Sequence, residues 1–206
     1  IGAGHAGVAA ATALRKLDKD INITLISEEK NLPYHRPPLS KKTVYSEKPS
    51  CDLLLSEDYY IKNNIKLTRN SPIEDIDPEN NCINLASKEL IHYEQLIIAT
   101  GVERCKLKIN GGELAKTLYS MEDAYSLSKS ISTAKRITVI GGGFIGCEIA
   151  SGSRKLGKEV TLLEAGPSIL GRSVAPIFAQ KVAKYHKSQG INILTNCKAL
   201  SIDNKE

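Results

Sequence analysis

Two copies of one pattern, a β-strand that ends in a glycine turn and leads into a helix, constrain the fold of this chain more than any other feature. The clearer copy begins at residues 137–140, whose β-prone side chains predict a buried strand. Gly141, Gly143 and Gly146 follow with the spacing G-x-G-x-x-G, and a helical pattern begins directly after them. This order of strand, glycine turn and helix is the context that a dinucleotide-binding fingerprint requires.

Each glycine of this turn has its own predicted role. Gly141 allows a tight turn, Gly143 lets a pyrophosphate approach the backbone, and Gly146 lets the helix pack closely on the strand. The free N–H groups at the start of the helix would then face the phosphates. A second strand at 160–163 ends at Glu164, about 20 residues after Gly146, where a carboxylate can hold an adenosine ribose. A glycine-rich turn in another kind of α/β protein is the weaker alternative.

The second copy of the pattern opens the chain. Gly2, Gly4 and Gly7 have the same spacing, a helical pattern follows, and a strand at 23–26 leads to Glu28. Two such units indicate either two cofactors that face each other or a duplicated domain.

The histidine and the basic residues of the first copy have separate predicted roles. His5 lies inside the phosphate turn without a ligand partner nearby in the sequence, so we interpret it as a backbone contributor and not as a metal ligand or a base. Arg15 and Lys16 are expected to face solvent from the helix that follows.

The amino-acid composition excludes some classes of binding partner. The formal net charge of +5 is modest and the basic residues are dispersed, while two Phe and no Trp leave little to stack on bases, so nucleic acid is not an expected partner. Five cysteines without a Cys-x-x-Cys pair favour reduced thiols in a cytosol. No apolar run approaches a membrane span and nothing at the start resembles a signal peptide, so we expect a cytoplasmic protein without a membrane partner.

Coarser patterns predict the remaining elements. A strand at 96–101 is expected to be buried, and Ser120 is expected to cap the helix that follows it. The predicted helices lie at 56–64, 121–130 and 175–189, and the predicted strands at 65–68, 73–77, 82–85, 90–93, 96–101, 191–194 and near Leu200.

A proline-rich stretch, PYHRPPLSK at 33–41, would by itself predict a solvated loop in which Ser40 caps a short helix. Together with GAGHAG, Glu28, ATG at 99–101 and GGGFIGCE, however, it resembles the FAD-dependent pyridine nucleotide reductases over nearly the whole chain. The resemblance is greatest to the ferredoxin, putidaredoxin and rubredoxin reductase branch. Disulfide reductases carry a redox-active Cys pair near RPPLSK, and NADH oxidase and peroxidase relatives carry a single reactive Cys there. This chain has no such pair, and we interpret Cys51 as structural.

The resemblance implies an α/β fold with two Rossmann-like, doubly wound dinucleotide-binding domains, glutathione-reductase-like in arrangement. Residues 1–106 would form the FAD-binding domain, without most of its first strand, and residues 107–206 an NAD-binding domain that is incomplete at its C-terminus. The chain would then be the N-terminal half of a reductase.

The implied function is transfer of electrons from NADH through FAD to a small acidic iron–sulfur carrier of the ferredoxin or rubredoxin type. Lys41 would approach the flavin and pair with Glu148 across the domain junction, and the charge of Glu164 would favour NADH over NADPH. Two alternatives stay open on the same scaffold: an NADH oxidase or monodehydroascorbate reductase, and a redox-responsive interaction protein that resembles apoptosis-inducing factor.

The resemblance also assigns the cofactor-binding residues. The family usually has an arginine two residues after ATG, where this chain has Glu103 followed by Arg104, and this departs from the FAD contacts of the family. The residues assigned to FAD are Gly2, Gly4, His5, Ala6, Gly7, Glu28, Arg36, Lys41, Ile73, Ala99, Thr100 and Gly101, and those assigned to NAD are Gly141, Gly143, Phe144, Ile145, Gly146 and Glu164. Lys41 and Glu148 are the expected catalytic residues, and no metal site is expected.

Overall fold

The computed structural model describes residues 1–47 and 50–203, which form two compact units. The first unit contains Ile1–His35 and Cys51–Glu103, and the second contains Arg36–Ser50 and Arg104–Glu206. The sequence prediction drew one boundary after residue 106 and left residues 36–50 with the first domain. These residues instead group with the second unit, because their two short 3-10 helices pack against its helices.

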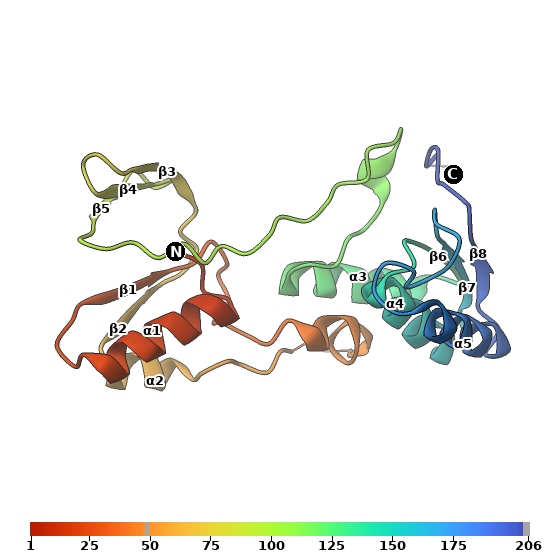
Figure 1. Cartoon of the computed structure of the whole chain (residues 1–206), viewed down its shortest axis with the longest axis horizontal. Coiled ribbons are helices and arrows are strands. Elements are labelled where there is room, and N and C mark those ends of the chain that lie inside the picture. The colour runs from red at the N-terminus through yellow and green to blue at the C-terminus, as the bar shows by residue number, and fades with distance from the viewer. Residues whose placement is uncertain (48–49, 204–206) are drawn as a thin grey trace. The chain divides into compact units, whose positions relative to one another are not determined.

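Two small sheets form the first unit (Figure 1). The strands β1 and β2 pair in parallel; α1 precedes β1 in the chain, and α2 lies in the connection from β1 to β2. The strands β3, β4 and β5 form an antiparallel meander in that order. The bounds are α1 His5–Leu17, β1 Ile23–Ile26, α2 Glu57–Lys62, β2 Ile65–Thr68, β3 Ile73–Asp77, β4 Cys82–Leu85 and β5 Leu90–His92.

Local chemistry explains several of these boundaries. The side chain of Ser56 accepts a hydrogen bond from the backbone N–H of Tyr59 and so caps α2. Asp77 accepts hydrogen bonds from the backbone N–H groups of Glu79 and Asn80, which closes the turn between β3 and β4. The predicted helix, strand and meander of this region are therefore confirmed.

The predicted buried strand at 96–101 is wrong. Ile97 and Ile98 are 47% and 62% exposed. Among the described residues, Ile1 provides the backbone pairing of this segment: its amino group donates to the carbonyl of Ile97 at 2.7 Å and its carbonyl accepts from Ala99 N–H at 2.8 Å. A ladder with one partner residue is too short to make a strand, and it leaves the apolar side chains uncovered.

Arg15 does not face solvent as the helical pattern predicted. It is buried, and its guanidinium donates five hydrogen bonds of 2.6–3.2 Å to backbone carbonyls. Their acceptors lie in the turn after α1 and at the end of α2: Asp18, Lys19, Ile21, Asn63 and Asn64. The side chain of Arg15 therefore links α1 to the turn after α1 and to the end of α2.

The second unit has a parallel sheet in the order β6-β7-β8 (Figure 1). Helix α4 connects β6 to β7, and α5 connects β7 to β8. The bounds are η1 Pro37–Ser40, η2 Thr43–Tyr45, η3 Gly112–Leu114, α3 Met121–Thr133, β6 Arg136–Ile140, α4 Phe144–Lys155, β7 Glu159–Leu163, α5 Pro176–Ser188 and β8 Asn192–Leu194.

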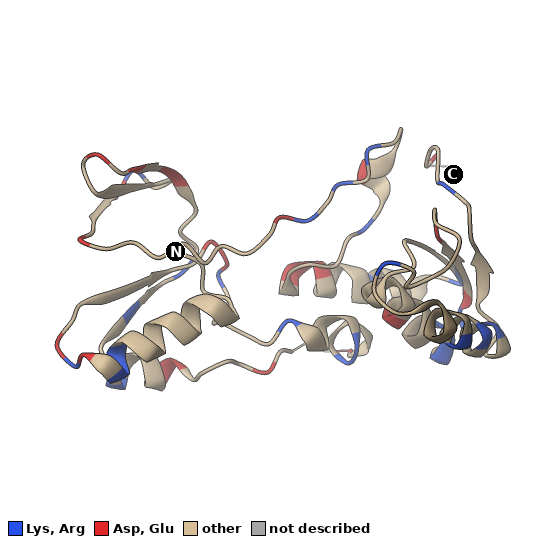
Figure 2. Cartoon of the chain, in the orientation of Figure 1, with Lys and Arg blue, Asp and Glu red and all other residues tan. Residues whose placement is uncertain are grey.

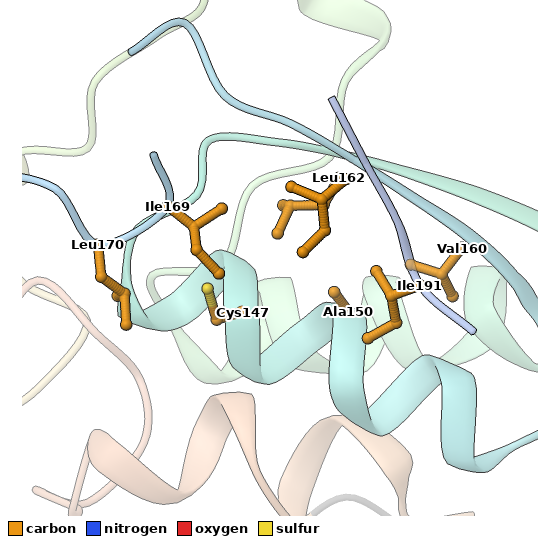
Figure 3. Close-up of a cluster of buried hydrophobic side chains, with 8 residues drawn as sticks. Cys147, Ala150, Val160, Leu162, Ile169, Leu170 and Ile191 are labelled. Carbon is orange, nitrogen blue, oxygen red and sulfur yellow. The ribbon is translucent and has the colours of Figure 1, made fainter. Parts of the chain in front are cut away.

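The core of this unit lies between α4 and the sheet (Figure 3). Ala150 of α4 and Leu162 of β7 are fully buried, and Ile169 from the loop after β7 closes the cluster. Arg154, near the end of α4, donates to the carbonyls of Gln189 and Lys158, and so has a role similar to that of Arg15 in the first unit.

In the second unit, one predicted feature is confirmed and two are wrong. Ser120 caps α3 as predicted, in a capping box with Asp123. The strand β6 is not buried, because it lies at the edge of the sheet and exposes Thr138 and Ile140. The strand expected near Leu200 is reduced to a single bridge between residues 110 and 201.

The charged residues are interspersed along both units (Figure 2). Within 1–47 and 50–203, no helix combines the length and the hydropathy that crossing a lipid bilayer requires.

Two tyrosines make stability sensitive to alkaline pH. Burial raises the pKa of Tyr45, in the second unit, from 10.0 to about 12, and burial does the same for Tyr60 in the first. A pKa that is higher in the folded than in the unfolded state stabilises the fold fully below pH 10, and this contribution is lost as pH rises from 10 to about 12. We expect urea unfolding to show a loss on the order of 2 kcal/mol over this range that Tyr45→Phe, which cannot ionise, does not show for the second unit. Equal pH dependence in both proteins would contradict the expectation.

Candidate functional site

The glycine turn of the first unit has three distinct glycine environments. Gly2 has φ +93°, and a Cβ there would lie 2.3 Å from the carbonyl oxygen of Ala99. A Cβ on Gly7 would lie 1.8 Å from the carbonyl oxygen of Gly2, so the helix could not pack this closely with any other residue. A Cβ on Gly4 would have no neighbour within 4 Å. The turn is therefore tight at its ends and open in the middle.

The glycine turn of the second unit repeats most of this arrangement, except that a Cβ on Gly141 would have no neighbour within 4 Å. Gly141 has φ +105°, a Cβ on Gly146 would lie 1.9 Å from the carbonyl oxygen of Gly141, and the space beside Gly143 is open. In both turns the middle glycine borders the open side, where a side chain would occupy the space in front of the helix.

The first turns of α1 and α4 face these open spaces. Gly4 and Gly143 are the N-caps, and neither helix has a side-chain cap. The two residues that begin each helix are exposed; these are His5, Ala6, Phe144 and Ile145. Uncapped N–H groups behind an open glycine suit a phosphate, since the helix dipole favours an anion there.

The predicted ribose acids differ in their surroundings. Glu164 follows β7 directly, and its two carboxylate oxygens accept hydrogen bonds from the backbone N–H groups of Gly142 and Gly166, each at 2.7 Å. The acid is thus fixed at the glycine turn. In the first unit Ser27 has the equivalent backbone position, and Glu28, one residue later, is exposed.

The other residues predicted for the flavin lie around the first turn or on the neighbouring sheet. The Ala99 carbonyl contacts Gly2, Thr100 and Gly101 are exposed, and Ile73 begins β3.

A further contact, which the sequence did not predict, joins the rings of His5 and His35. Nε2 of His5 lies 3.2 Å from Nδ1 of His35, and both side chains are exposed.

A cavity of about 610 Å³ in the first unit reaches Gly7 and Ala99 beside the phosphate turn. It lies along the inner side of α1 at Ala10, Ala11 and Leu14, and its lining includes neither Gly4 nor Thr100.

Lys41 and Glu148 form the predicted ion pair. Nζ of Lys41 lies 3.1 Å from Oε1 of Glu148 and donates to the carbonyl of Pro37 at 3.1 Å. Both residues belong to the second unit. Ser40 does not cap a helix: its hydroxyl donates to Oε2 of Glu148 at 2.5 Å.

Packing of residues 43–45 explains why this segment lies on α4. Val44 is fully buried against Ile131 and Ile149. The hydroxyl of Tyr45 donates to the carbonyl of Ile149 at 2.8 Å, and a Cβ on Gly152 would lie 2.2 Å from the tyrosine ring. The glycine therefore makes room for the ring, and the ring fixes the segment that carries Lys41. Neither contact has a signal in the sequence, because the partners are distant along the chain.

Two arginines have structural partners in the second unit. Arg36 donates to the carbonyl of Tyr119 at 2.8 Å, and its guanidinium lies 4.6 Å from the centre of the Tyr119 ring. Arg104 binds Asp123 at 2.7 Å, next to the cap of α3.

The cysteines close to these residues are free thiols. Cys147 is buried, and burial, with smaller contributions from the charges of Glu148 and Glu164, raises the pKa of its thiol to about 11. A thiol with so high a pKa is unreactive at neutral pH. Cys51 is half-buried.

Known proteins are similar to this chain in sequence and in fold. The model of the family described as pyridine nucleotide-disulphide oxidoreductase matches residues 1–206. The chain belongs to the pyridine nucleotide-disulphide oxidoreductase family.

Several members of this family are similar to the chain over almost its whole length. The rubredoxin-NAD(+) reductases of Pseudomonas putida and Ectopseudomonas oleovorans are 38% and 39% identical over 205 residues, which are 98% of this chain and 53% of each relative. A crystal structure of the ferredoxin reductase for the CYP199A2 system from Rhodopseudomonas palustris superposes with a TM-score of 0.94 at 33% identity. That match covers 99% of this chain and 51% of the other. The chain thus spans about half the length of these pyridine nucleotide-disulphide oxidoreductases.

Proposed function

We propose that this chain supplies the FAD-binding and NADH-binding parts of a reductase that passes electrons from NADH, through FAD, to a small acidic iron–sulfur protein of the rubredoxin or ferredoxin type. The observation that carries the proposal is the pair of Lys41 and Glu148, held 3.1 Å apart between RPPLSK and the helix of the second glycine turn. The names of the similar reductases support the choice of acceptor.

Each unit is proposed as a Rossmann-like, doubly wound domain. The FAD-binding domain would lie within residues 1–106 and the NAD-binding domain within 107–206, with residues 36–50 packed on the latter. The open glycines, the uncapped helix starts and the acid after each second strand support this division. The proposed ligands of each cofactor are the residues that the resemblance assigned, with Glu164 fixed by Gly142 and Gly166 where it can accept ribose hydroxyls.

Lys41 is proposed to supply positive charge to the reaction. FAD, when bound, supplies two-electron exchange with NADH and single-electron exchange with the iron–sulfur protein. An ammonium has three N–H donors, and those of Lys41 have two partners among the described residues, Pro37 and Glu148. The remaining donor can stabilise negative charge that develops during reduction, while Glu148 orients the ammonium.

The experiment that tests this function uses the full-length gene product. We expect it to purify with FAD, to be reduced by NADH, and to reduce rubredoxin or ferredoxin in the presence of NADH. Oxygen consumption with hydrogen peroxide release and no reduction of the carrier would favour the oxidase instead. Dimerisation driven by NADH with poor turnover would favour the redox-responsive interaction protein.

The proposed location is the cytoplasm. All five cysteines are free thiols, which is typical of a reducing compartment.

Cofactor choice should depend on Glu164. Its carboxylate would repel a 2′-phosphate, so Glu164→Arg should lower the NADH/NADPH ratio of kcat/KM at least tenfold, on the order of 1.4 kcal/mol. Steady-state kinetics with both nucleotides measure the ratio.

Glu164→Gln is the matched control for this experiment, because it removes the charge and keeps an acceptor oxygen for one of the two backbone N–H groups, those of Gly142 and Gly166. We expect it to lower the ratio by less than the arginine does. A ratio that neither substitution changes would mean that the ribose is held elsewhere.

A further inference from the structure

We propose that Ser40 is a positioning residue for the reaction: it holds one oxygen of Glu148, so that the other oxygen alone is shared with Lys41. The inference rests on the proposed function, since it concerns the charge that Lys41 presents to the flavin.

The carboxylate of Glu148 is divided between two partners. Its Oε2 accepts the hydroxyl of Ser40 at 2.5 Å, and its Oε1 lies 3.1 Å from the ammonium of Lys41. Ser40 is 5% exposed, whereas the side chains of Glu148 and Lys41 are 30% and 55% exposed. The contact with Ser40 is therefore the less exposed of the two. A hydrogen bond to a charged acceptor is stronger where less water competes for it, so Ser40 is the stronger constraint on how the carboxylate is turned.

Ser40 itself is firmly placed. Two prolines at the start of η1 fix its backbone, and Leu39 beside Ser40 is also buried. Farther along the segment, Tyr45 is anchored to α4. The hydroxyl of Ser40 therefore meets Glu148 from a rigid support.

Removing this hydroxyl would redistribute the donors of Lys41. Oε2 of Glu148 would then lose the donor that the structure gives it, and the remaining N–H of Lys41 is the donor closest at hand in this cluster. A carboxylate that accepts hydrogen bonds from two N–H groups of one ammonium holds that ammonium closer to itself. Less positive charge would then face the flavin, which makes the reduced flavin less stable and hydride transfer slower.

The test compares Ser40→Ala with two companions in the full-length gene product with FAD bound. Ser40→Thr keeps the hydroxyl. Ser128→Ala is the matched control, because Ser128 of α3 also donates a hydroxyl to the same segment, at Ser46, and not to Glu148. Stopped-flow reduction by NADH, the KM for NADH and the flavin midpoint potential are measured for each variant, and thermal unfolding shows that each is folded.

For Ser40→Ala we expect flavin reduction about tenfold slower, with the KM for NADH within about twofold of wild type. The midpoint potential should fall by about 30 mV, which is a tenfold change for a two-electron couple. Ser40→Thr should restore both values, and Ser128→Ala should match wild type. If Ser40→Ala does not fold, Ser40→Cys, with its weaker S–H donor, should lower the potential in the same direction.

An unchanged rate and potential in Ser40→Ala would overturn the inference. So would equal changes in Ser128→Ala, which would mean that loosening of the segment is sufficient. These results are distinct from failure of the proposed function, in which the wild-type protein would hold no FAD or would not be reduced by NADH.

Discussion

Replacing Lys41 with alanine in the full-length gene product is expected to slow reduction of the flavin by NADH about 10- to 1000-fold. The reason is electrostatic: the loss of a group that stabilises developing charge typically costs about 1.4–4 kcal/mol of transition-state stabilisation. The structure adds a second cost, because the carboxylate of Glu148 loses its cationic partner. Stopped-flow absorbance of the flavin under anaerobic conditions measures the effect.

Two controls make this expectation specific. Lys181→Ala removes the same charge from an exposed position on α5 and should leave the rate unchanged. Glu148→Gln, combined with Lys41→Ala in a double-mutant cycle, should show strong coupling, because the two side chains form one pair. A Lys41→Ala rate within twofold of wild type would remove Lys41 from the mechanism.

Arg15→Ala should cause the largest loss of stability in the first unit, about 3 to 5 kcal/mol in the free energy of unfolding. The guanidinium satisfies five backbone carbonyls, and hydrogen bonds to charged groups contribute more than neutral ones, although their effects do not simply add. Urea unfolding followed by circular dichroism, with hydrogen exchange to locate the change, measures it.

The neighbouring residue provides the control. Lys16 is exposed, so Lys16→Ala should change stability by no more than about 0.5 kcal/mol. Arg15→Lys should recover only part of the loss, because an ammonium has three donors where the guanidinium has five. Equal stability of the alanine and wild-type proteins would show that water replaces the arginine at these carbonyls.

The sequence predicted the parts of this molecule whose signals are local. The glycine turns, the capped helices α2 and α3 and the antiparallel meander depend on residues that are close along the chain. The resemblance predicted the pairing of Lys41 with Glu148, since it joined two motifs whose spacing alone says nothing about their distance.

What the sequence did not predict depends on partners that are distant along the chain. A helical pattern classes Arg15 as a surface residue, and only the folded turns after α1 and α2 show that its donors are used in the interior. The same applies to the ring of Tyr45 over Gly152 and to the hydroxyl of Ser40 at Glu148. The exposure of β6 depends on strand order, which no single segment records.

The grouping of residues 36–50 with the second unit has a consequence for synthesis of the protein. Val44 and Tyr45 leave the ribosome about 100 residues before their partner Ile149, which at ordinary elongation rates is a delay on the order of 5 to 20 s. During that time an apolar side chain that ends fully buried has no α4 to cover it. The segment that places Lys41 can therefore reach its final position only after translation has passed α4, and the proposed reaction centre is completed at that point.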